Sequence, residues 1–158
     1  MLKQGDTAPG FTLPNQNNEQ VALSDYLGKR LVLYFYPKDF TPGCTEQANA
    51  YSGGYDQIEA LQAVVVGVSK DSPKSHADFI KKNNLRFTLL SDENLETIKL
   101  YGVWKDKKMY GKTFLGVERS TFIIDEKGII QAVFAKVNPS KDLEAVLDYL
   151  NKMQNTSR

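Results

Sequence analysis

The chain has 158 residues, of which 41% are hydrophobic and 25% are charged, and its 20 basic residues nearly balance its 19 acidic ones. This length and composition predict a single globular domain over residues 1–153 and a loose C-terminal tail over residues 154–158. The net charge of +1 and the lack of a long apolar run or signal-like N-terminus give no indication of nucleic-acid or membrane binding, and we expect a cytoplasmic protein.

Strands and helices are expected to alternate along the chain. Nearly continuous apolar runs over 31–36 and 63–68 are typical of strands that are covered on both faces, as in a parallel sheet. The turn Asp125 to Gly128 separates two further apolar runs and predicts an antiparallel hairpin. In chain order we expect a hairpin (11–23), a strand (31–36), a helix (45–61), a strand (63–68), a helix (73–83), a short strand (87–90), a helix (95–101), the hairpin (120–124 and 129–134) and a final helix (140–152). The order predicts an α/β fold with a mixed central β-sheet flanked by helices, extended by an N-terminal β-hairpin.

Three local features carry further expectations. The pair Gly53-Gly54 should break or unwind the helix predicted over 45–61, because glycine is a poor helix former. His76, in the helix that begins after Ser72, is expected to lie on a solvated surface. The charged run Lys105 to Lys108 is expected to form a solvated loop.

Cys44 is the single cysteine of the chain, so it cannot form an intramolecular disulfide. With only one histidine the chain also lacks the ligands of an ordinary zinc site, and we expect neither a metal nor a cofactor. A lone cysteine is either a small buried hydrophobe or a reactive thiol.

The position of Cys44 favours the reactive thiol. It follows the strand 31–36 and stands where the next helix begins, so unpaired N–H groups and the helix dipole favour a thiolate. The same N–H groups can stabilise charge on a bound oxygen. Thr41 can place a hydroxyl against the sulfur, and the prolines at 37 and 42 stiffen the loop.

The segment from Tyr34 to Glu46 resembles the active-site segment of peroxiredoxins, most closely the bacterioferritin comigratory protein or peroxiredoxin Q subfamily. The pattern Pro-x-x-x-Thr-x-x-Cys is met by Pro37, Thr41 and Cys44. Further similar segments occur at 5–11, 67–73, 90–92, 101–104, 110–112 and 116–122.

This resemblance implies a thioredoxin-like fold and the reduction of hydrogen peroxide and organic hydroperoxides. It implies that Cys44, Thr41, Arg119 and Pro37 are catalytic. Gly43 and Glu46 are supporting residues: Glu46 either orients Arg119 or favours the helix N-terminus. A thiolate at Cys44 would attack the peroxide and become a sulfenic acid.

The chain departs from the subfamily pattern at Asn49, where many members carry a second, resolving cysteine. The resolving thiol should therefore come from another molecule, such as thioredoxin, a glutaredoxin or glutathione. Two alternatives stay open: a variant of a two-cysteine peroxiredoxin in which the resolving cysteine has been substituted, and a thioredoxin-like redox-sensing or binding protein without efficient turnover. We expect a monomer.

Overall fold

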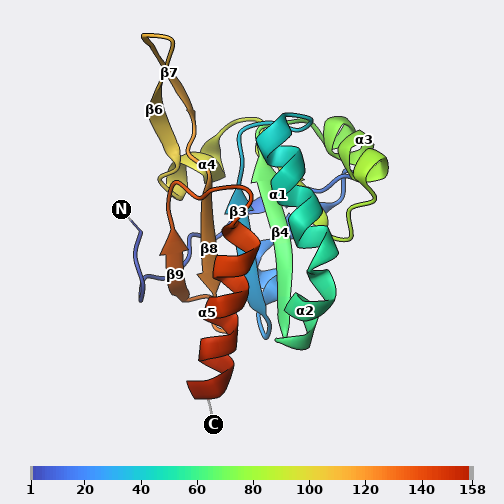
Figure 1. Ribbon diagram of the computed structural model, residues 1–158, viewed down its shortest axis with the longest axis vertical. Coiled ribbons are helices and arrows are strands. Elements are labelled where there is room, and N and C mark those ends of the chain that lie inside the picture. The colour runs from blue at the N-terminus through green and yellow to red at the C-terminus, as the bar shows by residue number, and fades with distance from the viewer. Residues whose placement is uncertain (1, 157–158) are drawn as a thin grey trace.

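A five-stranded mixed sheet lies at the centre of the computed structural model, which describes residues 2–156 (Figure 1). The strand order is β5–β4–β3–β8–β9. The first three of these strands are parallel, β8 is antiparallel to β3, and β9 is antiparallel to β8. The sequence predicts the mixed sheet and the antiparallel β8–β9 hairpin, whereas the pairing of β3 with β8 is seen only in the structure. The strands are β3 (Arg30–Phe35), β4 (Ala63–Ser69), β5 (Thr88–Ser91), β8 (Ser120–Ile124) and β9 (Ile130–Phe134).

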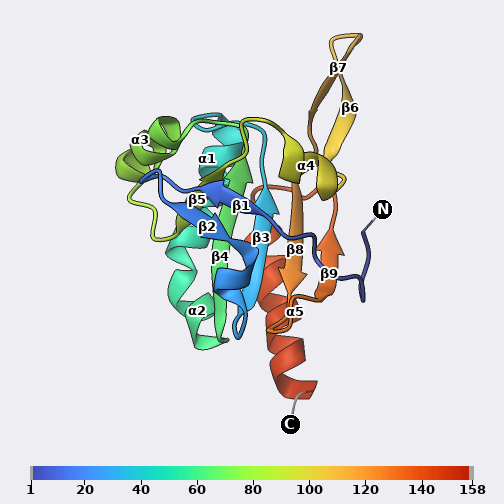
Figure 2. The ribbon, with the colours of Figure 1, turned by 180° about the vertical axis from the view of Figure 1, so that it is seen from behind.

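Helices and a small hairpin cover the two faces of this sheet. The helices are α1 (Pro42–Gly53), α2 (Tyr55–Ala60), α3 (Pro73–Asn83), α4 (Glu96–Leu100) and α5 (Asp142–Thr156). Figure 1 shows α1, α2 and α5 in front of the sheet, and Figure 2 shows α4 and the hairpin of β1 (Thr12–Pro14) and β2 (Gln20–Ala22) on the opposite side. A 3-10 helix, η1 (Leu23–Tyr26), follows that hairpin. The predicted N-terminal hairpin is therefore confirmed.

Strand β3 supplies side chains to both layers of the core. Leu31, Leu33 and Phe35 pack into one buried cluster, whereas Val32 and Tyr34 pack into the other. Side chains alternate between the faces of a strand, so a continuous apolar run is buried only where both faces are covered. This alternation explains why the run 31–36 predicts a central strand.

The helix after β3 is interrupted where the paired glycines predict a break. α1 ends at Gly53, Gly54 stands between the two helices, and α2 begins at Tyr55. α1 begins at Pro42, three residues before the predicted start, so that Cys44 belongs to its first turn. α3 begins as predicted, because the Ser72 side chain accepts a hydrogen bond from the Ser75 N–H at 3.2 Å.

The interpretation of Lys105 to Lys108 as a solvated loop is wrong. These residues belong to β6 (Trp104–Met109), which pairs with β7 (Lys112–Val117) as an antiparallel hairpin. The hairpin projects beyond the rest of the molecule (Figure 1). Its turn residues Tyr110 and Gly111 have φ values of 53° and 76°, which suit a two-residue hairpin turn. Because this hairpin is largely exposed to solvent, β6 and β7 lack the alternation of apolar residues that would have predicted strands here.

The final helix extends further than predicted. α5 continues to Thr156, so residues 154–156 are helical and not a loose tail, whereas residues 157–158 lie outside the described residues. Val146 and Leu150 are completely buried on its inner face, and this packing holds the helix against the sheet. None of the described helices is long and apolar enough to span a membrane.

Candidate active site

Cys44 lies at the junction of the central sheet and α1. It is a free cysteine with 1% of its surface exposed, in the first turn of the helix whose N-cap is Thr41. The Thr45 N–H donates to the Thr41 carbonyl at 2.9 Å, and Pro42 has no N–H. Helix geometry therefore leaves the N–H groups of Gly43 and Cys44 without an acceptor inside the helix. The prediction that Cys44 stands at a helix start is confirmed.

Arg119 contacts the sulfur from the neighbouring strand. It immediately precedes β8, and its Nη2 donates to Cys44 Sγ at 3.4 Å. A Cβ atom placed on Gly43 would lie 3.1 Å from Arg119 Nη2, so the absence of a side chain at Gly43 lets the guanidinium approach the helix start. Arg119 is half-buried, which strengthens the effect of its charge on the sulfur.

Two buried polar residues fix the direction of Arg119. Its Nη1 donates to Gln47 Oε1 at 2.7 Å, and Gln47 Nε2 donates to Asp142 Oδ2 at 2.9 Å. The same Asp142 oxygen accepts hydrogen bonds from Tyr51 and, at 2.8 Å, from Thr121 Oγ1. Because Asp142 accepts from the amide NH₂ group of Gln47, the Gln47 carbonyl oxygen must face Arg119. Residues of α1, α5 and β8 thus position one guanidinium.

Sequence reasoning missed Gln47 and Asp142, and it left two roles open for Glu46: orienting Arg119 or favouring the helix N-terminus. Glu46 is exposed and lies outside the first turn of α1, and the contact that orients Arg119 comes from its buried neighbour Gln47. Neighbouring residues of a helix point about 100° apart, so only one of the two can face the sheet. Gln47 lies three residues after Cys44 on the same helix face, and this spacing is the signal that could have identified it.

Thr41 and Pro37 lie in the loop before Cys44 but do not bond to the sulfur. Thr41 Oγ1 donates to the Lys38 carbonyl at 2.8 Å, which leaves its oxygen as an acceptor. The Pro37 carbonyl accepts from Lys70 Nζ at 3.1 Å. Neither residue forms a hydrogen bond with Cys44 or Arg119 in the described part of the chain.

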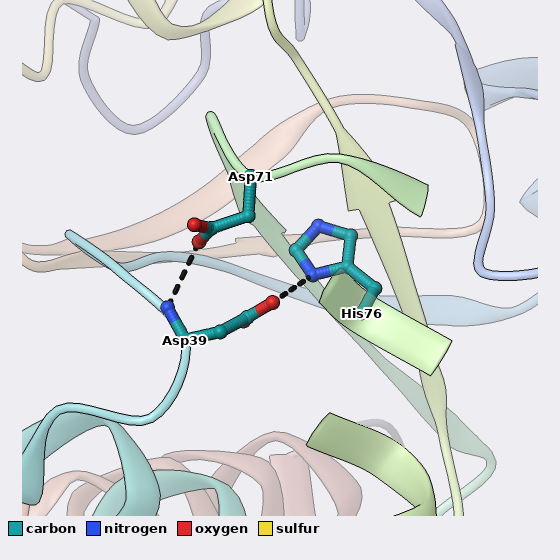
Figure 3. Close-up of side chains that lie close together, drawn as sticks. All are labelled: Asp39, Asp71 and His76. Atoms are coloured by element: carbon teal, nitrogen blue, oxygen red, sulfur yellow. Dashed lines mark hydrogen bonds and ion pairs between the residues drawn. The ribbon is translucent and has the colours of Figure 1, made fainter. Parts of the chain in front are cut away.

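A cluster of Asp39, Asp71 and His76, of which Asp39 and His76 are buried, clamps this loop (Figure 3). His76 Nδ1 lies 2.7 Å from Asp39 Oδ2, and Nε2 lies 3.0 Å from the Leu90 carbonyl, so Nε2 carries a hydrogen and donates it. The Asp39 N–H donates to Asp71 Oδ2 at 2.8 Å. The expectation of a solvated His76 is wrong, because its side chain is completely buried.

The same three residues have the composition of a cation site, with ligand atoms within 4.8 Å of one another. Each of these atoms already takes part in a hydrogen bond, including one from Ser69 Oγ to Asp71 Oδ2 at 2.7 Å. Tyr36 also donates to Asp39 Oδ1 at 2.6 Å, and burial together with the Asp39 charge raises the pKa of this phenol. A cation would have to displace these bonds, and we interpret the cluster as a structural clamp.

The position of the substituted resolving cysteine faces solvent. Asn49 is exposed on α1, and its Nδ2 donates to Asn83 Oδ1 on α3 at 3.3 Å. This contact joins the two helices on the outside of the molecule. It supplies no sulfur and no other nucleophile to Cys44.

The fold and the contact of Cys44 with Arg119 are those of a peroxiredoxin, and comparison with known proteins identifies the family. Residues 4–133 match the model of the AhpC/TSA family, and the chain belongs to this family. It is 48% identical over 136 residues to the putative peroxiredoxin bcp of Coxiella burnetii, covering 86% of this chain and 90% of that protein. It is 43% identical to peroxiredoxin Bcp of Escherichia coli, covering 96% of this chain and 97% of the relative.

Solved structures agree with these relatives. A cysteine-to-serine mutant of PrxQ from Xylella fastidiosa superposes with a TM-score of 0.90 at 36% identity, covering 100% of this chain and 99% of the other. The bacterioferritin comigratory protein of Xanthomonas campestris superposes with a TM-score of 0.86 at 36% identity, covering 90% and 91% of the two chains. The resemblance to the bacterioferritin comigratory protein and peroxiredoxin Q subfamily is confirmed, as is the thioredoxin-like peroxiredoxin fold.

Proposed function

We propose that the chain is a thiol-dependent peroxidase that reduces hydrogen peroxide and organic hydroperoxides at Cys44. The observation that carries the proposal is the contact of Cys44 Sγ with Arg119 at 3.4 Å in the first turn of α1. The family agrees: the structural study of the Xanthomonas campestris relative describes alkyl peroxide reduction activity.

The first step is attack of the Cys44 thiolate on one peroxide oxygen. The O–O bond breaks, the sulfur becomes a sulfenic acid, and water or an alcohol leaves after taking up a proton. Negative charge develops on the departing oxygen. In the proposal Arg119 and the free N–H groups of the first turn stabilise this charge, since they are positioned before the substrate arrives.

Thr41 and Pro37 take supporting parts in this scheme. The Thr41 hydroxyl already donates to Lys38, so its oxygen can accept a hydrogen bond from the peroxide proton. Pro37 fixes the start of the loop and contributes no N–H that could compete for the substrate. Gly43 acts by leaving space for Arg119.

The second step needs a thiol from another molecule, because the chain has one cysteine. That thiol condenses with the sulfenic acid to a mixed disulfide, and a further thiol restores Cys44 by exchange. Thioredoxin, a glutaredoxin and glutathione are the candidate reductants. The proposal places the reaction in the cytoplasm, where thiols are kept reduced. The residues proposed to act on the peroxide all belong to one chain, in keeping with a monomer.

Steady-state peroxide consumption distinguishes this enzyme from the two alternatives. The native chain should consume many equivalents of peroxide with at least one of the three reductants, and Cys44→Ser should consume none. A redox sensor would stop after one equivalent. If the chain is a two-cysteine enzyme whose resolving cysteine has been substituted, Asn49→Cys should turn over faster than the native chain with thioredoxin as the only reductant. A one-cysteine enzyme would gain nothing from this substitution.

A further inference from the structure

A basic cleft lies beside Arg119 and follows β6 along the β6–β7 hairpin. It has a volume of about 340 Å³, within the range of small-ligand sites. Five basic and two acidic side chains line it, together with Met109 and Phe114. The charged lining residues are Lys105, Lys107, Lys108, Arg119, Lys136, Asp106 and Glu118.

Lys107 points from the hairpin toward the active site. Side chains alternate along β6, so Lys105 and Lys107 lie on one face of the hairpin, opposite Gly116 and Phe114 of β7. The Lys107 stem crosses Gly116 closely enough that a Cβ atom there would lie 3.1 Å from Lys107 Cδ. Gly116 lies at the base of the hairpin, three residues before Arg119. The ammonium group is therefore directed back toward the guanidinium.

The five basic side chains of the cleft outnumber its two acidic ones, so the cleft keeps an excess of positive charge. Across residues 2–156, no ion pair involves Lys105, Lys107, Lys108 or Lys136. Burial lowers the pKa of Lys107, and the nearby Arg119 charge lowers it further. A cleft in which cations outnumber acidic groups attracts anions.

Arg119 connects this cleft to the reacting sulfur. The guanidinium lines the cleft and also lies 3.4 Å from Cys44 Sγ. A ligand held by the lysines would thus lie against the guanidinium that contacts Cys44 Sγ. The missing component of the reaction is a thiol, because the chain carries no resolving cysteine.

We propose that this cleft binds the carboxylate groups of a small anionic thiol and presents its sulfur to oxidised Cys44. The inference rests on the proposed function and names the class of its second substrate. The thiolate attacks Sγ of the sulfenic acid, an S–S bond forms, the S–O bond breaks, and hydroxide leaves as water after taking up a proton. A second thiolate then attacks the disulfide, which releases Cys44 as a thiolate and the small molecule as its own disulfide.

The test separates the two halves of the cycle. Cys44 is first oxidised with one equivalent of hydrogen peroxide, and its reduction is then followed by rapid mixing with mercaptosuccinate, an anionic thiol, or with 2-mercaptoethanol, a neutral one. The variant is Lys107→Gln with Lys136→Gln. Lys127→Gln, in the exposed turn at the far end of β8, is the matched control.

We expect the double variant to lose about tenfold in its rate with mercaptosuccinate, the lower end of the range for electrostatic steering. Its rate with 2-mercaptoethanol should change less than twofold, and the control should resemble the native chain with both thiols. Added salt should slow the reaction of the native chain with mercaptosuccinate more than that of the variant, which keeps three of the five cations. Equal changes with the two thiols, or no change with either, would overturn the inference.

A carboxylate could also belong to the peroxide, as in a fatty-acid hydroperoxide. The oxidation half-reaction is therefore measured with such a hydroperoxide and with neutral tert-butyl hydroperoxide. If the double variant reacts more slowly with the fatty-acid hydroperoxide alone, and its rate with mercaptosuccinate is unchanged, the cleft binds the peroxide. That result would overturn the inference that the cleft binds a thiol. Failure of native Cys44 to react with hydrogen peroxide would instead refute the proposed function itself.

Discussion

Replacing Asp142 by alanine removes one carboxylate oxygen that three buried donors share. Gln47 Nε2, Tyr51 OH and Thr121 Oγ1 all donate to Asp142 Oδ2, and the residue is 2% exposed. Burial and the Asp142 charge raise the pKa of Tyr51, so this phenol remains a donor. Alanine would leave three donors without their acceptor in an interior that excludes water.

The cost follows from this count of donors. A buried donor left unsatisfied costs about 1–3 kcal/mol, so the three together should lower the free energy of unfolding by about 3 kcal/mol or more. Asp142→Asn is the matched control. Its carbonyl oxygen can replace Oδ2, while its NH₂ group takes the place of Oδ1, which has no partner among the described residues. One unpaired NH₂ group should cost about 1–3 kcal/mol, which is less than the cost of alanine.

Equilibrium urea unfolding under reducing conditions measures both variants. The transition midpoint should fall further for alanine than for asparagine, with a similar slope for the native chain and both variants. Loss of the carboxylate also frees the Gln47 amide to rotate, so the rate of peroxide attack should fall in the alanine variant. If the free energy of unfolding of the alanine variant lies within about 1 kcal/mol of the native value, and its Cys44 is oxidised at the native rate, Asp142 does not position Arg119 through Gln47.

Three further predictions concern the same site and the loop beside it. Arg119→Met should slow oxidation of Cys44 by about 100-fold or more, since one preorganised donor group of this kind contributes a factor of that size. Stopped-flow mixing with peroxide measures the rate. A loss below about tenfold would contradict the role of Arg119 in stabilising the departing oxygen. Gly43→Ala should displace Arg119 Nη2, which would lie 3.1 Å from the new Cβ, and should therefore slow oxidation of Cys44. The free energy of unfolding should change by less than about 1 kcal/mol. An unchanged oxidation rate would contradict the role of Gly43 in admitting Arg119. His76→Ala should lower the free energy of unfolding by about 3 kcal/mol, because the Leu90 carbonyl loses its donor, Asp39 loses one of its partners and a buried cavity is left. A native-like urea midpoint would exclude the role of His76 in clamping the loop.

The sequence predicts the central sheet well because burial determines its pattern. The runs 31–36 and 63–68 are continuous in apolar residues since both faces of β3 and β4 are covered. The β6–β7 hairpin has no such constraint. Its strands are largely exposed and rich in lysine, and only the Tyr110-Gly111 turn indicates a hairpin.

The site is predicted where its chemistry is local and missed where it depends on distant partners. Cys44, Thr41 and Gly43 belong to one helix start, which the sequence around Pro42 indicates directly. Gln47 meets Asp142, 95 positions further along the chain, and no local pattern relates the two. A polar residue on a helix is predicted to face solvent unless its partner is known.

His76 illustrates the same limit, although its spacing carries a usable signal. It precedes the buried Phe79 by three positions, so the two share a face of α3. Its partner Asp39 lies 37 positions earlier, in the loop before Cys44. Periodicity can therefore predict that a histidine is buried, but the acceptors that make burial favourable come from the tertiary structure.

Trapping of Cys44 after a single exposure to hydrogen peroxide tests the central claim most directly. The reduced protein is mixed with one equivalent of peroxide and a reagent that captures sulfenic acids, such as dimedone, and the labelled residue is identified by mass spectrometry. The proposed function predicts a dimedone adduct on Cys44 at stoichiometric yield, and a much lower yield in Arg119→Met at the same reaction time. Cys44 that remains a free thiol while the peroxide persists would contradict it.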